Sequence, residues 1–329
     1  MLKQDQDTVV SFYKFVKIQD PKALQTKLKE LTDKLNMKGT IILAHEGVNA
    51  MVSGSSSNIQ AFKEYLWADK HFTDLEFKDS YYDKESFRRM LVKVKKYIIT
   101  MRKEVDPLEE TGEYIAAEEF KKWQDEQKDM LIVDTRNDYE YQMGTFKNAI
   151  DPDIKSFDEF PDWVEKELGD QKDKTIVTFC TGGIRCEKAT AYMKKIGFKK
   201  VYQLEGGIIK YLEKTMDEKE NNHWEGECIV FDKRKAIDKS LEPSRKNICY
   251  VCLEEIMPGD SSHSYPAGEA CNRCDSKMSQ HHQKRLARGI ERHKQNLEAR
   301  EKFLASEREK YKDFAGANEA TNVAADANQ

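Results

Sequence analysis

Between about Tyr114 and Thr215, short apolar segments typical of strands alternate with segments typical of amphipathic helices. A chain with this alternation buries its apolar strands in a parallel sheet that carries helices on both faces. Ligands of such sheets bind beyond the carboxyl ends of the strands, and Cys180 directly follows one of them. The predicted strands are residues 130–134, 175–179 and 201–204, and the predicted helices are 118–123, 163–168, 188–196 and 208–215.

A different order of elements precedes this region. Asp20-Pro21 opens a helical pattern of leucines spaced three or four residues apart, and Ser55 is placed to cap a second helix. The order strand, helix, two strands, helix, strand is that of a split βαβ, ferredoxin-like α+β domain. The predicted extended segments are residues 9–16, 40–44, 47–54, 75–82 and 90–100.

These patterns divide the chain into four regions. We expect a ferredoxin-like domain over residues 1–108, with a linker at Asp106-Pro107, and a parallel-sheet α/β domain over 113–216. A cysteine-rich C-terminal region covers 217–283, and a charged helix with a disordered tail covers 284–329.

The composition limits the function classes. The net charge of −4 argues against a uniformly basic surface for nucleic acid but is compatible with a local basic face. The chain has no run of 18 apolar residues and begins without a secretory or transit pattern, so we expect no membrane association and a cytoplasmic location. The seven cysteines, four of them in C-x-x-C pairs, suit metal or redox chemistry in a reducing compartment.

The segment Cys180–Arg185 joins the predicted strand that ends at Phe179 to the helix that begins near Arg185. Gly182 and Gly183 permit backbone angles that other residues rarely adopt, so the N–H groups of the loop can turn inward and cradle an anion. Such a cradle, with the fixed charge of Arg185, lowers the pKa of a sulfur at position 180 and favours the thiolate. The cradle residues are Thr181, Gly182, Gly183 and Ile184.

Each residue of this region has a structural alternative. Cys180 alone would be read as a buried cysteine that ends a core strand, but the glycines and the arginine behind it favour the reactive nucleophile. Cys186, one turn into the helix, either resolves an oxidised or persulfidated Cys180 or packs the helix. Asp134 and Arg136 are expected to support the loop through an ion pair rather than to touch substrate.

The loop Cys180-Thr-Gly-Gly-Ile-Arg185 resembles a rhodanese active-site loop. Its C-x4-R spacing is shorter than the C-x5-R of cysteine phosphatases, and the smaller ring suits a persulfide sulfur better than a phosphate. Two further segments resemble rhodanese signatures, namely Asp134-Thr-Arg136 with the following Tyr139-Glu140 and Gly144–Ile150, and Leu204-Glu-Gly-Gly207.

The resemblance extends to a bacterial family, the rhodanese-like tRNA uridine-34 hydroxylases. It is carried by Glu46-Gly-Val-Asn49, by Cys180-Thr-Gly-Gly-Ile-Arg-Cys186 and by Trp224-Glu-Gly-Glu-Cys228. Two positions depart from the family pattern: Thr145 stands where the family often has His, and Ala50 where Gly is frequent.

The resemblance implies an oxidoreductase that converts uridine at the wobble position of tRNA to 5-hydroxyuridine with molecular oxygen as co-substrate. By resemblance, Cys180 is the essential residue and carries a persulfide, and a sulfur or electron donor protein is an implied partner. The residues themselves show no dinucleotide, flavin or iron motif, so the sequence indicates no required cofactor.

Two C-x-x-C pairs lie in the C-terminal region. Their separation allows four thiolates to surround a structural zinc ion, whereas four unrelated reduced cysteines are the alternative. The residues are Cys249, Cys252, Cys271 and Cys274.

A tRNA substrate requires phosphate-binding charge and aromatic surfaces for anticodon bases. Tyr81, Tyr82 and Trp224 are aromatic candidates, although each basic cluster by itself equally fits a solvated face. The basic candidates are Arg88, Arg89, Lys93, Lys95, Lys96, Lys199, Lys200, Lys233, Arg234, Lys235, Lys284, Arg285, Arg288 and Arg292.

Two other functions use the same residues. A plain sulfurtransferase, which moves sulfane sulfur to an acceptor, would share every residue of the Cys180 loop. A non-enzymatic RNA-binding or scaffold protein would retain only the fold, and the presence of both Cys180 and Arg185 argues against it.

Overall fold

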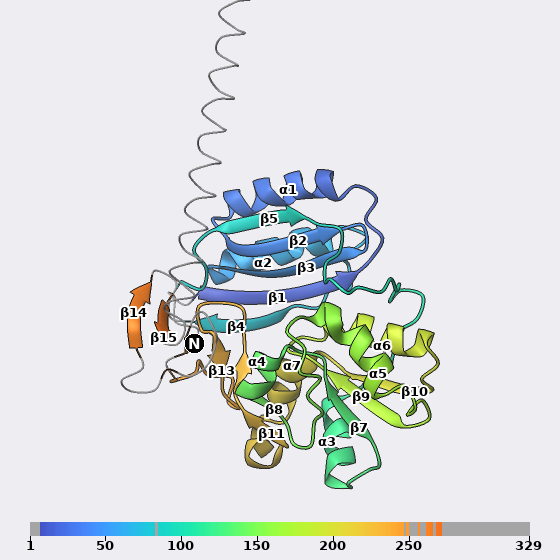
Figure 1. Ribbon diagram of the computed structural model, residues 1–329. Coiled ribbons are helices and arrows are strands. Elements are labelled where there is room, and N and C mark those ends of the chain that lie inside the picture. Colours follow the sequence, from blue (N-terminus) through green and yellow to red (C-terminus); the bar gives the residue numbers. More distant parts are fainter. Residues whose placement is uncertain are drawn as a thin grey trace, which may run out of the picture. The chain divides into compact units, whose positions relative to one another are not determined.

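The computed structural model describes residues 7–82, 85–246, 248, 249, 256, 261–265 and 268–271. The chain divides into two compact units, Met1–Ile248 and Cys249–Gln329. Within the first unit, a mixed sheet built by the N-terminal part of the chain and a parallel sheet built by the middle part can be followed in Figure 1.

The N-terminal sheet has the strand order β4-β1-β3-β2-β5. β1 pairs antiparallel with β3 and β4, β2 pairs antiparallel with β3, and β5 joins β2 as a parallel edge strand. The strands are β1 (Asp7–Phe15), β2 (Lys38–Ala44), β3 (Gly47–Gly54), β4 (Lys78–Tyr82) and β5 (Met90–Val94).

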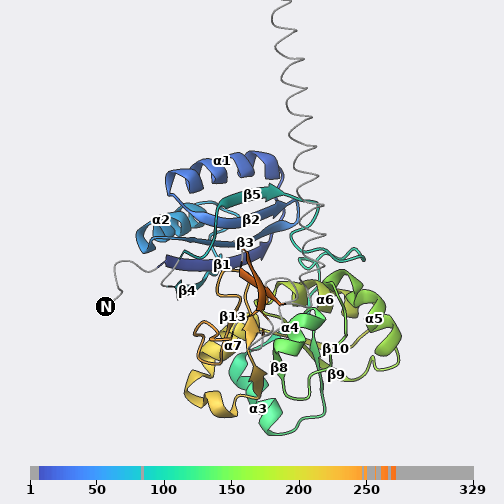
Figure 2. The ribbon, with the colours of Figure 1, turned by 60° about the vertical axis from the view of Figure 1, so that its left-hand side comes forward.

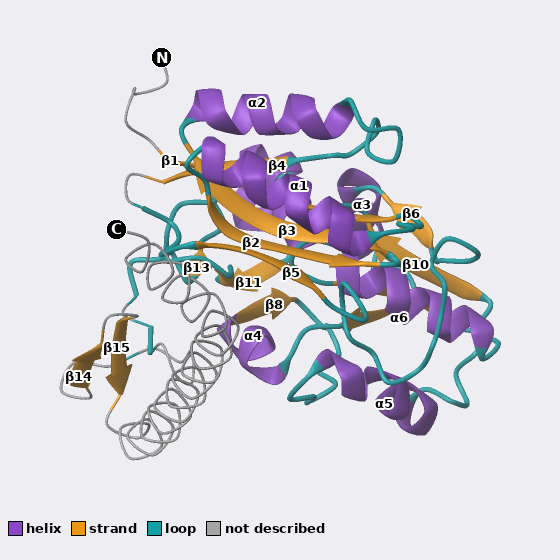
Figure 3. Cartoon of the chain, turned by 90° about the horizontal axis from the view of Figure 1, so that it is seen from above, coloured by secondary structure: helices purple, strands orange, loops and turns teal. Residues whose placement is uncertain are grey.

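Both helices of this domain, α1 (Pro21–Lys34) and α2 (Ser56–Trp67), cover one face of the sheet, as Figure 3 shows. Asp20 accepts hydrogen bonds from two N–H groups of the first turn of α1, and Ser55 accepts one from Asn58 in α2. Since side chains alternate along a strand, Val10 and Phe12 of β1 join the core beneath the helices, and Ser11 and Tyr13 lie on the opposite face.

The middle part of the chain forms a parallel sheet of order β6-β10-β9-β7. The helices α3 and α7 pack on one face and α5 and α6 on the other, each pair with its own buried cluster (Figure 2). The elements are β6 (Glu113–Ile115), α3 (Ala117–Asp125), β7 (Leu131–Asp134), α5 (Phe160–Glu167), β9 (Thr175–Phe179), α6 (Ile184–Lys195), β10 (Lys200–Leu204) and α7 (Gly207–Lys214).

Smaller elements complete the first unit. β11 returns to pair antiparallel with β8, so the segment after α7 packs against the parallel-sheet domain. They are α4 (Asp138–Met143), β8 (Gly144–Phe146), the 3₁₀ helices η1 (Phe157–Glu159) and η2 (Met216–Asn221), β11 (Trp224–Gly226), β12 (Cys228–Ile229) and β13 (Ala236–Ile237).

In the second unit, β14 (Ser261–Tyr265) and β15 (Gly268–Cys271) pair antiparallel. The predicted charged helix and tail, residues 284–329, lie outside the described residues. None of the helices in the described ranges combines the length and the apolar character that crossing a bilayer requires.

The predicted fold class, a parallel-sheet α/β domain preceded by an α+β domain, is confirmed. The extended segment predicted over 90–100 is too long, because β5 ends at Val94. Beyond that point the N–H of Ile98 is bound by the Glu46 carboxylate at 2.8 Å instead of by a neighbouring strand.

Candidate functional site

Cys180 lies in the turn that connects β9 to α6. Gly183 caps α6 with a φ of 103°, and its N–H donates a hydrogen bond to Cys180 Sγ at 3.1 Å. A Cβ at position 183 would lie 2.8 Å from the Tyr13 hydroxyl oxygen. Any other residue at this position would also have to adopt a positive φ, which residues with a side chain rarely do. Glycine at position 183 therefore permits the turn that directs this N–H at the sulfur.

A second glycine turn, after β10, supports the Cys180 loop. Gly207 has a φ of +70°, and a Cβ there would lie 2.4 Å from the Cys180 carbonyl oxygen. The N–H groups of Ile208 and Ile209 donate to the carbonyls of Cys180 and Thr181 at 2.9 and 3.2 Å. The second turn thus satisfies the carbonyls of Cys180 and Thr181 and fixes the start of the loop.

The surroundings of Cys180 favour its thiolate. Burial by itself raises the pKa of a thiol, but here it is outweighed by a hydrogen bond from the Cys186 thiol, by the charge of Arg185 and by the backbone N–H groups of both residues. Together they hold the pKa of Cys180 well below its ordinary value. Burial and the adjacent Cys180 sulfur raise the pKa of Cys186 well above its ordinary value, so Cys186 stays a protonated donor.

Arg185 acts on the sulfur through its charge, because Glu140 holds its guanidinium. The two guanidinium nitrogens donate to the two Glu140 carboxylate oxygens at 2.7 and 2.8 Å. Burial opposes ionisation of Glu140, but the charge of Arg185 lowers the pKa of this carboxyl below its ordinary value. Glu140 belongs to the segment that resembles a rhodanese signature, but its pairing with Arg185 spans 45 positions of the chain, and no local pattern predicts that pairing.

Asp134 and Arg136 form an ion pair that is wholly buried. Arg136 Nε and Nη2 donate to the two Asp134 oxygens at 2.9 and 2.7 Å, and Nη2 also donates to the Gly144 carbonyl. Thr145, one of the two departures from the family pattern, donates its hydroxyl to Asp134 at 3.1 Å. The pair lies behind the Cys180 loop, at the end of β7, and does not line the cavity in front of it.

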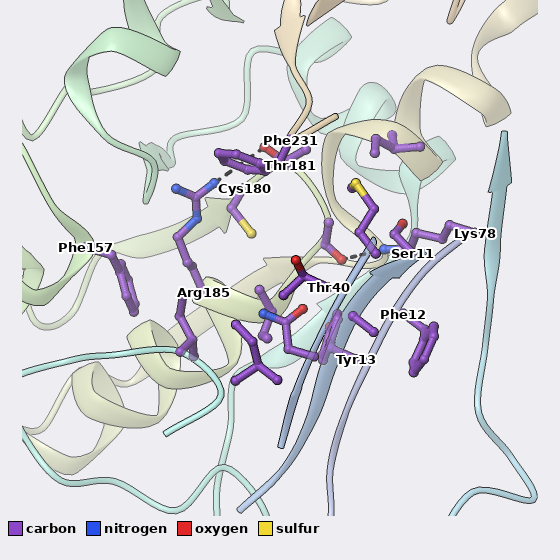
Figure 4. A pocket seen from close by; sticks show the side chains of 18 of the residues that line it. Ser11, Phe12, Tyr13, Thr40, Lys78, Phe157, Cys180, Thr181, Arg185 and Phe231 are labelled. Carbon is purple, nitrogen blue, oxygen red and sulfur yellow. Dashed lines mark hydrogen bonds between the residues drawn. The ribbon is translucent and has the colours of Figure 1, made fainter. Parts of the chain in front are cut away.

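A cavity of about 550 Å³ opens in front of Cys180. One wall is the loop itself, and the opposite wall is the face of the N-terminal sheet that α1 and α2 leave uncovered. Figure 4 shows the Cys180 sulfur pointing toward the strands that carry Ser11, Tyr13 and Thr40, whereas the Arg185 guanidinium points toward Thr181. The cavity is also lined by Asn49, Lys78, Tyr139, Phe157, Thr181, Gly182, Ile184 and Phe231.

Two side chains of the N-terminal sheet, Lys78 and Tyr13, form hydrogen bonds with the parallel-sheet domain. The Lys78 ammonium donates to the carbonyls of Gly182 and Gly206, and the Tyr13 hydroxyl donates to Glu187 of α6 at 3.0 Å. Sequence reasoning misses both residues, because their partners lie more than 100 positions away. The local sequence indicates only that Lys78 lies in a strand whose other residues are polar or aromatic.

The predicted zinc ligands fall in the second unit and are described in part. Cys249 and Cys271 are buried, and the Cys271 N–H donates to Cys249 Sγ at 3.4 Å. Cys252 and Cys274 lie outside the described residues. The described ranges contain no group of three or more His, Cys, Asp or Glu placed to hold a metal.

Two residues predicted to contact tRNA are placed elsewhere. Trp224 is 0% exposed and packs edge-to-face on Phe146, so the prediction that it stacks an anticodon base is wrong. Arg234 is buried with both carboxylate oxygens of Asp232 as acceptors, so its charge is already engaged. Tyr81 is 46% exposed.

Comparisons with known proteins match both domains. The UPF0176 acylphosphatase-like domain matches residues 8–98, and the rhodanese-like domain matches residues 116–214. Among solved structures, the rhodanese-like domain of the Anabaena Alr3790 protein is similar at 20% identity, with a TM-score of 0.29, over 34% of this chain and 78% of that one.

Curated relatives match over both domains together. A protein of Legionella pneumophila strain Paris named tRNA uridine(34) hydroxylase is 49% identical over 235 residues, which are 71% of this chain and 91% of the relative. Its counterpart from strain Corby is 48% identical over the same shares. The resemblance inferred from the sequence motifs is confirmed, and the chain belongs to the tRNA uridine(34) hydroxylase family.

Proposed function

We propose that this chain hydroxylates C5 of the uridine at position 34 of tRNA, with Cys180 at the reaction centre. The observation that carries the proposal is the cavity in which a sulfur of lowered pKa faces the uncovered sheet of a second domain. A rhodanese loop that only relayed sulfur between small molecules would not need that second wall. The names of the relatives identify the base.

The cavity suits a nucleobase taken out of the anticodon stack. Its volume of about 550 Å³ lies within the range of roughly 300–1,000 Å³ typical of small-molecule sites. Enzymes that modify a base read the extruded base by hydrogen bonds to its edge and by stacking. Ser11, Thr40 and Asn49 offer polar groups for the uracil edge, and Phe231, which is 55% exposed, offers an aromatic surface.

Exposed cations lie along the edge of the same sheet. Arg88, Arg89, Lys93 and Lys95 flank or occupy β5, whose neighbour β2 contributes Thr40 to the cavity. Phosphate contacts position a nucleic acid without reading its sequence. We propose that these four side chains hold the anticodon backbone while the base enters the cavity.

We propose that the working form of Cys180 is a persulfide. The Cys180 thiolate attacks the outer sulfur of a donor persulfide, the S–S bond of the donor breaks, and the donor leaves as its thiolate. The loop N–H groups then stabilise the charge of the outer sulfur on Cys180 as they do that of the thiolate. The donor is an external persulfide or a donor protein. Intact-mass analysis of the purified chain tests this, because the wild type gains one sulfur atom and Cys180→Ser does not.

Hydroxylation by molecular oxygen requires an electron donor. One oxygen atom enters the C5–H bond and the other leaves as water, so two electrons and two protons come from outside the substrate. We propose that a partner protein or a small thiol supplies them. Hydroxylation under ¹⁸O₂ tests the source of the oxygen, since the label must appear in 5-hydroxyuridine, and label from H₂¹⁸O must not.

Sulfur transfer is the second candidate, because the matching rhodanese-like domain and the Cys180 loop would serve it equally. Mass spectrometry of tRNA nucleosides from a deletion strain separates the two functions. Loss of 5-hydroxyuridine supports hydroxylation, and loss of thiolated nucleosides supports sulfur transfer. Complementation by wild type but not by Cys180→Ser assigns the effect to the loop.

We also propose a structural zinc ion in the second unit, held by Cys249, Cys252, Cys271 and Cys274. The hydrogen bond between Cys271 and the Cys249 sulfur supports the pairing of the two C-x-x-C segments. Metal analysis of protein purified without chelator should find about one zinc per chain, and Cys249→Ser should lower that stoichiometry. A content near zero in the wild type contradicts the proposal.

A further inference from the structure

Lys78 is a cation that one domain places on the reactive loop of the other. It is the first residue of β4 in the N-terminal sheet and lines the cavity together with Cys180. Its ammonium donates hydrogen bonds to the carbonyls of Gly182 and Gly206, the latter at 2.7 Å. One side chain therefore ties the Cys180 loop to the glycine turn that supports it.

The position of this cation follows from the orientation of the loop. The loop N–H groups point at the sulfur, so some of its carbonyls must point outward, and an outward carbonyl needs a partner when water is excluded. The Cys180 and Thr181 carbonyls are bound by Ile208 and Ile209. Lys78 binds the Gly182 carbonyl, the next one along the loop.

The charge of Lys78 also acts on the sulfur. Partial burial lowers the pKa of Lys78 to about 8, and the nearby Cys180 anion opposes this shift and favours the charged lysine. The attraction is mutual, because two opposite charges each stabilise the ionised form of the other. The other charged groups that face Lys78 are Glu213 and Lys210 of α7 and Glu76 of the preceding turn, and the Tyr13 ring of β1 lies 5.9 Å away.

We infer that Lys78 is a positioning residue for the reaction: it locks the Cys180 loop in its anion-binding conformation and supplies a second positive charge, besides Arg185, that keeps the sulfur ionised. The inference rests on the proposed role of Cys180 as the reacting sulfur. It makes the N-terminal domain part of the reaction centre. Displacement of that domain would then weaken the nucleophile as well as the binding of RNA.

The test measures the sulfur itself and needs no hydroxylation assay. Full-length protein reacts with iodoacetamide across a pH series, and peptide mass spectrometry follows alkylation of Cys180. The variants are Lys78→Met, Lys78→Gln and Lys78→Arg. The matched control is Lys63→Met, since Lys63 is a buried lysine of the same domain that binds Asp79, the neighbour of Lys78 on β4.

Loss of the charge in Lys78→Met and Lys78→Gln should raise the pH midpoint of Cys180 alkylation by about 1 pH unit. At pH values below the wild-type midpoint, the alkylation rate should then be about tenfold lower than in the wild type. Lys78→Arg keeps the charge and should keep the wild-type midpoint, as should Lys63→Met. If Lys78→Met does not fold, the alkylation midpoint of Lys78→Gln tests the inference alone, because this variant also lacks the charge but retains an N–H donor. A wild-type midpoint in the uncharged variants, or an equal rise in Lys63→Met, overturns the inference, whatever the hydroxylation assay shows.

Discussion

The guanidinium of Arg185 and the carboxylate of Glu140 form two parallel hydrogen bonds, at 2.7 and 2.8 Å, inside the protein. Glu140 is completely buried and Arg185 almost so. The charge that the loop directs at Cys180 is therefore held in place by a carboxylate of α4 rather than left free for substrate. Glu140 therefore fixes the position of Arg185 although it lies outside the loop.

Glu140→Gln should lower the free energy of unfolding by about 3–5 kcal/mol, because removal of one partner of a buried ion pair leaves the other charge uncompensated. Urea denaturation of the full chain measures this. The control is Glu167→Gln, which removes the exposed contact with Lys166 and should change stability far less. An equal decrease in the free energy of unfolding in the two variants would contradict a larger contribution of the buried ion pair to stability.

Cys186 should act as a hydrogen-bond donor rather than as a resolving thiol. Cys186→Ser keeps a hydroxyl donor and should retain most of the activity, whereas Cys186→Ala removes the donor and should raise the alkylation midpoint of Cys180. Hydroxylation assays and the pH series described for Lys78 provide both readouts. Loss of activity in Cys186→Ser with an unchanged midpoint would favour a resolving role.

Gly207→Ala should destabilise the chain by about 1–3 kcal/mol or more, because the new Cβ would lie 2.4 Å from the Cys180 carbonyl oxygen at a φ of +70°. Gly54→Ala is the matched control, since its Cβ would meet its nearest neighbour at an ordinary 3.6 Å. Thermal unfolding compares the two. Comparable melting temperatures would mean that the glycine turn can shift away from the loop without cost.

Stability should depend on pH through Cys180. A group whose pKa is lowered by folding contributes stability that is complete above its unfolded value, about 8.5, and is lost as the pH falls through the folded value. The difference in unfolding free energy between wild type and Cys180→Ser should therefore grow with pH in this window, by at most about 1.4 kcal/mol per pH unit. Urea denaturation at several pH values measures it, and a constant difference would contradict an ionised Cys180.

Local sequence patterns predicted the centre of the site closely. The sequence predicts a strand that ends at Phe179 and a helix that begins near Arg185, and the structure has β9 ending at Phe179 and α6 beginning at Ile184. These bounds were predictable because strand composition, paired glycines and helical spacing are properties of neighbouring residues. The contacts that complete the site join distant segments. Lys78 reaches Gly182 across 104 positions, and no local pattern encodes such a pairing.

Exposure was equally hidden from the sequence. Trp224 has the amphipathic ring of a base-stacking residue, yet β11 places it in a cluster of aromatic rings beneath the parallel sheet. Its Nε1 donates to the Gly226 carbonyl at 3.1 Å, so its polar group is satisfied inside the protein. Trp224 faces the core because the chain returns after α7 and β11 pairs with β8. Amino-acid composition does not predict this return.

The central claim is that folding holds the Cys180 sulfur as an anion at neutral pH. Alkylation of Cys180 in the full-length wild-type chain, followed by peptide mass spectrometry across a pH series, tests it most directly. We predict a midpoint well below 8.5, the ordinary value for a cysteine thiol. A midpoint at or above that value would contradict the account.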